Sequence, residues 1–405
     1  MNENSKILKE NNILSFSGDE NKNTKSKKKK IIENFKFIRK INTNKETIEK
    51  KERNPGIDFL RILGMYAIVV HHVIHFGKVL SKYSHYRQVS LINILCFFHI
   101  CVYGLISGII GHKTHKYSNL LYLWFCTFFY SVSILLIYKE YNPIIMKKFT
   151  FFFPVIYNKY WYFTQYFGMY LFLPLINQGL SLVNKSQLKI IVLSIIFIFV
   201  IWRDFMSSKG DPFLVNSGHS IIGLLLFYIT GAYLGKYVIK TDKKIFFYLI
   251  YLIVYFCSSY LCYYLAFYNG HYANFILITI LKKFFTLRIN SLAMILQGIS
   301  ITLFFSQIKY NKYLGKIFTF IGPLTFGVYL IHSHELIYQN EFEKLFQKYP
   351  KNLPLHSLII FILLKGFIIL FVCLIIDYFR YLLFTILQIR KICIIIEKII
   401  NRIIG

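Results

Sequence analysis

Long apolar segments alternate with short polar ones over most of this chain. Each apolar segment has about 20 residues, the length that an α-helix needs to cross the hydrocarbon core of a bilayer. The pattern predicts an all-α, polytopic membrane helix bundle of about ten transmembrane helices. The fifth segment is short and the ninth contains a Gly322-Pro323 break, so these two are the least regular. The ten segments are residues 57–76, 89–110, 119–137, 160–178, 188–203, 218–236, 245–268, 290–307, 317–335 and 356–379.

The polar and basic residues divide the chain into three parts. Residues 1–55 are rich in Lys, Asn, Glu and Ser, so we expect a disordered basic tail. Residues 56–380 form the expected ten-span domain, and residues 381–405 have the basic amphipathic pattern of a helix on a membrane surface. The first tail carries fifteen Lys and Arg residues, and an even number of spans returns the chain to the same side. The positive-inside rule therefore predicts a multi-pass protein of the cell membrane with both termini in the cytoplasm.

The composition agrees with this interpretation. Of 405 residues, 56% are hydrophobic and 19% are aromatic, which is typical of a chain that lies in a lipid bilayer. The net charge of +30 comes from residues spread over tails and loops rather than from one basic patch. No motif of a nucleic-acid-binding module is found, so we expect the bilayer as a partner and no nucleic acid.

The first apolar segment carries an acid, an arginine and three histidines. Arg61 and His72 are eleven positions apart, so they share one helix face at a separation of roughly 16 Å. Asp58 lies three positions before Arg61 and can pair with it. Asp58 and Arg61 can be read as simple interface anchors, but His71 and His72 lie past the middle of the span, where a polar ring needs a partner or a cavity.

The ninth segment carries a second candidate histidine. In the predicted topology His332 lies as far from the start of its span as His72 does, roughly 22 Å from the inner boundary. The two rings could line one cavity, and Tyr329, one turn before His332, could orient it. The alternative is that His332 and His334 are interfacial residues at a helix end.

Two other patches carry polar or aromatic side chains. Lys113 and Lys116 lie in a short inner loop, where they could hold a phosphate or contact lipid headgroups. The run Tyr160 to Tyr166 could stack on a sugar ring or belong to an aromatic belt. Lys365 and Asp377 are interpreted as structural charges. No serine nucleophile motif, Walker loop or zinc-binding helix is found, so we expect histidine to handle protons and no metal to take part.

Four patches make the chain resemble the acyltransferase 3 family of integral membrane acyltransferases, in particular its branch that acetylates surface glycans. They are Asp58-x-x-Arg61 with His72, Tyr160-Trp161-Tyr162 with Tyr166, Gly231-Ala-Tyr233-Leu-Gly235, and Phe326-Gly-Val-Tyr329-Leu-Ile-His332. The resemblance covers residues 54 to 379. It implies an acyl-CoA donor, usually acetyl-CoA, bound from the cytoplasm, and a hydroxyl acceptor on a cell-surface glycan or glycolipid.

The resemblance also implies roles for individual residues. Arg61 helps to hold the donor and His72 acts in the transfer, with His71 and His332 as further catalytic candidates. Lys113 and Lys116 take the place of two arginines that many members carry. Acceptor binding is expected from aromatic side chains: Trp161, Tyr162, Tyr166 and Tyr329. The alternative functions are a transporter or channel with a proton or substrate path through Arg61, His72 and His332, and a membrane scaffold without catalytic activity.

Overall fold

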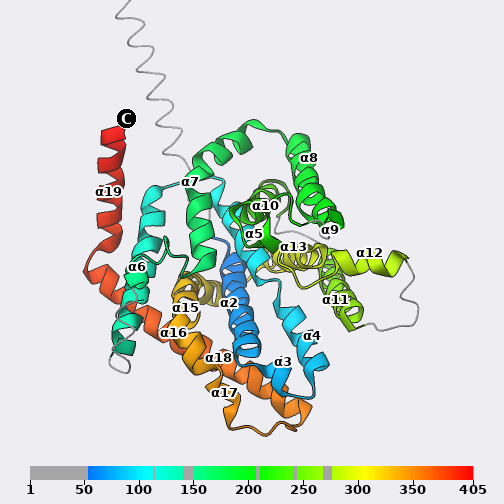
Figure 1. Ribbon diagram of the computed structural model, residues 1–405. Helices are drawn as coiled ribbons and strands as arrows, with labels where there is room; N and C mark the ends of the chain where they lie inside the picture. Colours follow the sequence, from blue (N-terminus) through cyan, green and yellow to red (C-terminus); the bar gives the residue numbers. More distant parts are fainter. Residues whose placement is uncertain are drawn as a thin grey trace, which may run out of the picture. The chain divides into compact units, whose positions relative to one another are not determined.

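The computed structural model describes residues 53–113, 115–139, 149–206, 210–239, 244–267 and 276–404. These residues form helices joined by short connections, and no strand occurs among them (Figure 1). The predicted all-α bundle is therefore confirmed. The tail predicted for residues 1–55 lies almost wholly outside the described residues, and the division into three parts stays a prediction.

Each of the ten apolar segments contains helix, and in the described part of the chain seven stretches are long and apolar enough to cross a membrane by length and composition. Helix α13, Leu292–Gln307, is apolar but shorter. The chain is thus a multi-pass membrane protein. The seven stretches are α2 (Pro55–Phe76), α4 with α5 (Tyr86–Cys96 and His99–Gly111), α6 (Tyr117–Lys139), α10 with η6 (Ile221–Tyr233 and Leu234–Val238), α11 (Ile245–Phe267), α14 with η7 and α15 (Lys312–Ile321, Gly322–Leu324 and Thr325–His332), and α18 (Leu355–Ile386).

The remaining helices connect or flank these spans. Helices α7 and α8 correspond to the fourth and fifth apolar segments, and α19 follows α18 after a short turn. Their bounds, with those of the shorter helices, are α3 (Val79–Lys82), η2 (Phe149–Phe152), α7 (Trp161–Leu182), α8 (Lys185–Ile196), η3 (Phe197–Trp202), α9 (Arg203–Met206), η5 (Asn216–Gly218), α12 (Ile276–Phe284), α16 (Glu335–Ile337), η8 (Tyr338–Phe342), α17 (Lys344–Gln347) and α19 (Ile389–Ile404).

Helix α2 is the element around which the others pack (Figure 1). It begins where the Asn54 side chain accepts hydrogen bonds from the first free amides, with Pro55 in the first turn. It contacts α4, α5, α13, α14, α15 and α18. In its apolar window 56% of the residues are buried, against 22% in α11 and α18. Most polar side chains on α2 therefore face protein, the exposed His75 excepted, whereas α11 and α18 leave much of their apolar surface to lipid.

Two of the spans are broken within the membrane, and both border α2. The ninth segment turns at Gly322–Leu324, where the sequence places its Gly-Pro break. The second segment turns at Phe97 and Phe98, between α4 and α5. Irregular backbone at membrane depth is tolerated only where protein buries it or where it lines a cavity. Both breaks interrupt the α-helical hydrogen bonding next to the polar face of α2, through a turn at Phe97 and Phe98 and a 3₁₀ turn at Gly322–Leu324.

Glycine lets α5 and α10 pack backbone to backbone. A methyl group on Gly108 would overlap the carbonyl of Tyr228, and one on Gly231 would overlap the carbonyl of Leu105. Close approach through small residues is a common way for membrane helices to associate. This packing explains physically why glycine stands at the first position of the Gly231 to Gly235 motif.

A buried ion pair within α18 contacts α6 and α15. The guanidinium of Arg380 donates to both carboxylate oxygens of Asp377, at 2.9 and 2.6 Å, and the Tyr130 hydroxyl donates to the same carboxylate at 2.9 Å. Asp377 is 0% exposed and lies against Gly327 of α15, where any side chain would overlap it. Lys365 lies over the rings of Phe346 and Tyr349. Lys365 and Asp377 thus both have partners within the bundle, as the interpretation of these two residues as structural charges predicts.

Candidate active site

The structure brings together the two histidines that the sequence places at equal depth. The ring centroids of His72, on α2, and His332, at the end of α15, are 5.0 Å apart. His332 is 1% exposed, and its Nδ1 lies 2.6 Å from the carbonyl oxygen of Val328. Because a carbonyl oxygen only accepts, this Nδ1 carries the proton. The lone pair on Nε2 is then left to accept from the Ser333 hydroxyl, 3.3 Å away.

His72 differs from its partner in how its ring is held. Its Nδ1 is buried and has no hydrogen-bond partner among the described residues. An imidazole with a free nitrogen beside a second, anchored imidazole can take up or deliver a proton to a bound reactant. The pair therefore has the composition of a proton-handling centre.

Further imidazole rings lie next to the pair of His72 and His332. His71 lies 5.6 Å from His72 and 5.9 Å from His75, measured between ring centroids. Its Nδ1 lies 2.7 Å from the side-chain oxygen of Asn93 on α4. The ring of His99, the first residue of α5, is 5.5 Å from that of His71. The sequence analysis missed Asn93 and His99, because the bend that brings them here falls between two phenylalanines and has no turn signal.

Arg61 is held at the other end of the same helix face. Its guanidinium lies 2.6 Å from the Asp58 carboxylate, which is 1% exposed. The Asp58 side chain packs against Gly322, at the break of the ninth segment. The side chain of Arg61 is 23% exposed, so the charge remains accessible while its partner is buried. An arginine anchored in this way is well placed to bind an anion.

The loop with Lys113 and Lys116 lies beyond Arg61 toward the start of α2. Helix α5 runs antiparallel to α2, as the contacts of His99 with His71 and of the Tyr103 hydroxyl with the Arg61 carbonyl show. The loop backbone is held by α7, since Asn177 donates to the Gly111 carbonyl and Tyr170 donates to the Lys116 carbonyl. The side chains of both lysines are exposed.

The four predicted aromatic residues are connected by contacts between their rings. Tyr162, Tyr166 and Tyr329 lie in one cluster, in which Tyr162 is 6.4 Å from Tyr166 and 6.2 Å from Tyr329. Tyr103, which the sequence analysis missed, joins this cluster to the Arg61 carbonyl. Tyr329 does not hold the His332 ring, because the Val328 carbonyl does so. Trp161 joins the cluster through Tyr162, with ring centroids 5.8 Å apart, and its ring also lies 4.5 Å from that of His219.

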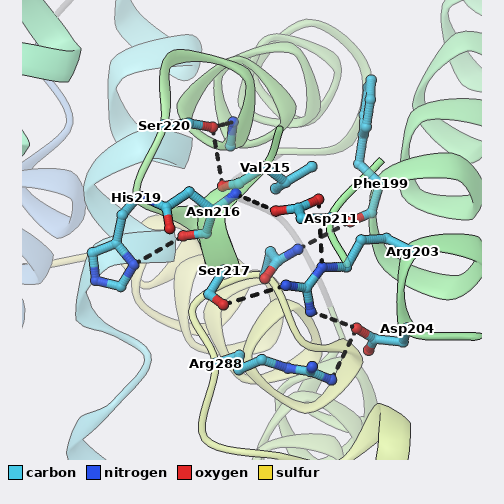
Figure 2. A network of polar contacts seen from close by, with 12 residues as sticks. Phe199, Arg203, Asp204, Asp211, Val215, Asn216, Ser217, His219, Ser220 and Arg288 are labelled. Atoms are coloured by element: carbon cyan, nitrogen blue, oxygen red, sulfur yellow. Dashed lines mark hydrogen bonds and ion pairs between the residues drawn. The ribbon is translucent and has the colours of Figure 1, made fainter. Parts of the chain in front are cut away.

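His219 belongs to a loop that a network of ion pairs holds in place (Figure 2). Asp204 is 0% exposed, and one of its oxygens lies 3.2 Å from Arg203 and 2.9 Å from Arg288. Arg203 also donates to Ser217, two residues before His219. The side chain of His219 is exposed at one side, and its partial burial lowers the pKa of the ring. The network therefore holds this ring beside Trp161.

His334 has a structural role and is not part of the pair of His72 and His332. Its Nδ1 accepts from the amide of Leu336 and its ring stacks on Phe151 at 5.1 Å. Burial lowers its pKa to about 4, an effect that the backbone of Ser131 and the charge of Glu335 partly offset. The ring caps the short helix α16 and stands apart from the His72 pair.

Comparison with known families identifies the chain. Curated proteins and solved structures gave no match. A family model described as an acyltransferase domain matches residues 54–378, from the cap of α2 to the last turns of α18. This range contains Arg61, the His72 and His332 pair and the aromatic cluster. Because it covers most of the chain, the protein belongs to the acyltransferase 3 family.

Proposed function

We propose that this membrane acyltransferase moves an acetyl group from acetyl-CoA to a hydroxyl of a cell-surface glycan or glycolipid. In this proposal His72 is the general base and Arg61 helps to hold the donor. The observation that carries it is the contact between the rings of His72 and His332. His72 lies on α2, the helix that also presents the anchored Arg61. Acyl transfer needs both a proton acceptor and an anion-binding group, and one helix face supplies them.

The spacing along α2 fits the shape of the donor. Arg61 and His72 lie on one uninterrupted helix, roughly 16 Å apart along its axis. With both termini in the cytoplasm, the phosphates of CoA would lie near Arg61, Lys113 and Lys116. The pantetheine arm would then extend along α2 and bring the thioester to the histidine pair.

The reaction balances with the groups present. The acceptor hydroxyl oxygen forms a bond to the thioester carbonyl carbon while His72 takes the hydroxyl proton. The carbon–sulfur bond then breaks, and the leaving thiolate takes that proton as free CoA forms. His332, with its Nδ1 fixed on Val328, keeps the two rings in register. General base catalysis of this kind contributes a factor of about 10² to 10⁴ in rate.

The aromatic groups are assigned to the acceptor. Tyr162, Tyr166 and Tyr329 present ring faces and hydroxyls near the path from Arg61, and Trp161 with His219 extends this aromatic surface from Tyr162. Aromatic faces pack on the apolar faces of sugar rings, while tyrosine hydroxyls supply hydrogen bonds. These five residues would therefore position a glycan hydroxyl.

The test is transfer by the purified protein in liposomes. Labelled acetyl-CoA and surface glycan from a deletion strain should give acetylated glycan and one free thiol for each ester formed. A transporter would move its solute without consuming thioester, and that result would refute the proposal. The acetyl content of surface glycan in the deletion strain, compared with its parent, then identifies the acceptor.

A further inference from the structure

The break between α4 and α5 places the start of a helix in the middle of the membrane. Helix α4 ends at Cys96 and α5 begins at His99, within a membrane-spanning stretch of residues Tyr86 to Gly111. Its N-cap residue, Phe98, has a side chain that makes no hydrogen bond to the first turn of α5. Free amides at a helix start carry partial positive charge, and at this depth lipid cannot satisfy them.

His99 adds an unsatisfied polar group at the same point. Its side chain is 2% exposed, yet neither ring nitrogen has a hydrogen-bond partner among the described residues. An imidazole always carries at least one N–H, so a buried donor is left unsatisfied here. Leaving such a donor without an acceptor costs about 1 to 3 kcal/mol, which a bound acceptor atom would recover.

The position of His99 relative to His72 and His332 indicates which acceptor atom could bind to its N–H. His71 lies between the two, with ring centroids 5.6 Å from His72 and 5.5 Å from His99. A thioester carbonyl attacked beside His72 would therefore lie within reach of the start of α5. Negative charge develops on the carbonyl oxygen as the attack proceeds, and a helix N-terminus favours an anion.

We infer that His99 and the first amides of α5 bind the carbonyl oxygen of the acyl donor and stabilise the oxyanion formed during transfer. This inference rests on the proposed acyl transfer. When the acceptor oxygen bonds to the carbonyl carbon, the π electron pair of the C=O bond moves to the carbonyl oxygen. That oxygen then accepts a hydrogen bond from the His99 N–H. When the carbon–sulfur bond breaks, this electron pair forms the C=O bond again. The thiolate leaves and takes the proton from His72.

The experiment compares two variants at His99 and one control variant, each in the full chain and in liposomes. His99→Leu removes the donor and should lower kcat by about 10²- to 10³-fold. The KM for acetyl-CoA should change less than about threefold, because the interaction forms mainly in the transition state. His99→Gln keeps an N–H donor and should recover at least about tenfold of that loss. His356→Leu, an exposed histidine at the start of α18, is the control and should keep the wild-type rate.

A second measurement uses the wild-type protein alone and so does not depend on how the variants fold. The carbonyl stretch of bound [1-¹³C]acetyl-CoA should move to lower frequency than in water, as expected for a strongly polarised carbonyl. An unshifted carbonyl would overturn the inference, and so would a His99→Leu kcat within threefold of wild type. Either result with an active wild-type protein leaves the proposed function standing. A wild-type protein that transfers nothing refutes the proposed function itself.

Discussion

The rings of His72 and His332 lie 5.0 Å apart although 259 residues separate them in the chain. Helix α2 supplies one ring and the last turn of α15 supplies the other, and the two helices pack directly against each other. Only His332 is anchored, through Nδ1 and the Val328 carbonyl. This asymmetry assigns the two rings different tasks: His72 exchanges the proton and His332 holds the arrangement.

His332→Phe should therefore reduce transfer without abolishing donor binding. The ring volume is retained but the hydrogen bonds to Val328 and Ser333 are lost. We expect kcat to fall by about 10²-fold, at the low end of general base effects, with the Kd for acetyl-CoA unchanged. Steady-state kinetics measures kcat, and calorimetric titration of the same preparation measures the Kd for acetyl-CoA. An altered Kd with an unchanged kcat would assign His332 to donor binding instead.

Arg61→Lys should weaken donor binding while sparing the chemical step. Lysine keeps the charge but loses the planar guanidinium that pairs with Asp58 and with phosphate oxygens. We expect the KM for acetyl-CoA to rise about tenfold, equivalent to about 1.4 kcal/mol, with kcat within about threefold of wild type. Kinetics with varied acetyl-CoA at fixed acceptor separate the two. A fall in kcat at an unchanged KM would place Arg61 in catalysis rather than in binding.

Asp377→Asn should destabilise the bundle more than the loss of an exposed ion pair does. The variant leaves Arg380 buried without its counter-charge, which typically costs about 3 to 5 kcal/mol. Glu343→Gln removes the partner of Lys78 in an exposed pair and should cost less than about 1 kcal/mol. Thermal unfolding in detergent compares them. Equal melting temperatures for the two variants would show that the buried pair does not hold α18 in place.

Acid should destabilise the protein partly through His334. Its folded pKa of about 4 lies below the ordinary value for histidine, so the unfolded chain binds more protons between those values. The stability associated with this ring is present above about pH 6.5 and is lost as the pH falls toward 4. Melting temperatures of wild type and His334→Gln should therefore differ in their slope against pH over this window. Parallel slopes would exclude His334 as a contributor.

The sequence predicted much of the bundle because lipid imposes a simple rule. Apolar segments of sufficient length become helices, and polar groups within them turn inward, as Asp58 and Arg61 do. Helical spacing also placed His72 and His332 at a common depth. The break at Gly322-Pro323 was visible because glycine and proline mark it in the sequence.

Other features depend on tertiary packing and left no local signal. The bend at Phe97 and Phe98 lies in an apolar run, so nothing marked His99 as the first residue of a new helix. Tyr329 is one turn from His332 in sequence, yet its ring packs against Tyr160 and Tyr162. Trp161 meets His219, whose loop is held by an ion-pair network in which α9 supplies Arg203 and Asp204 (Figure 2). The roles assigned to these residues stay predictions.

The most direct test is the rate of acetyl transfer by His72→Ala in liposomes, measured as labelled glycan formed from labelled acetyl-CoA. The account predicts a loss of about 10² to 10⁴ in kcat, with normal insertion into the membrane and wild-type affinity for acetyl-CoA. Transfer by His72→Ala at close to the wild-type rate would contradict it, because no other residue in this account takes the proton from the acceptor hydroxyl.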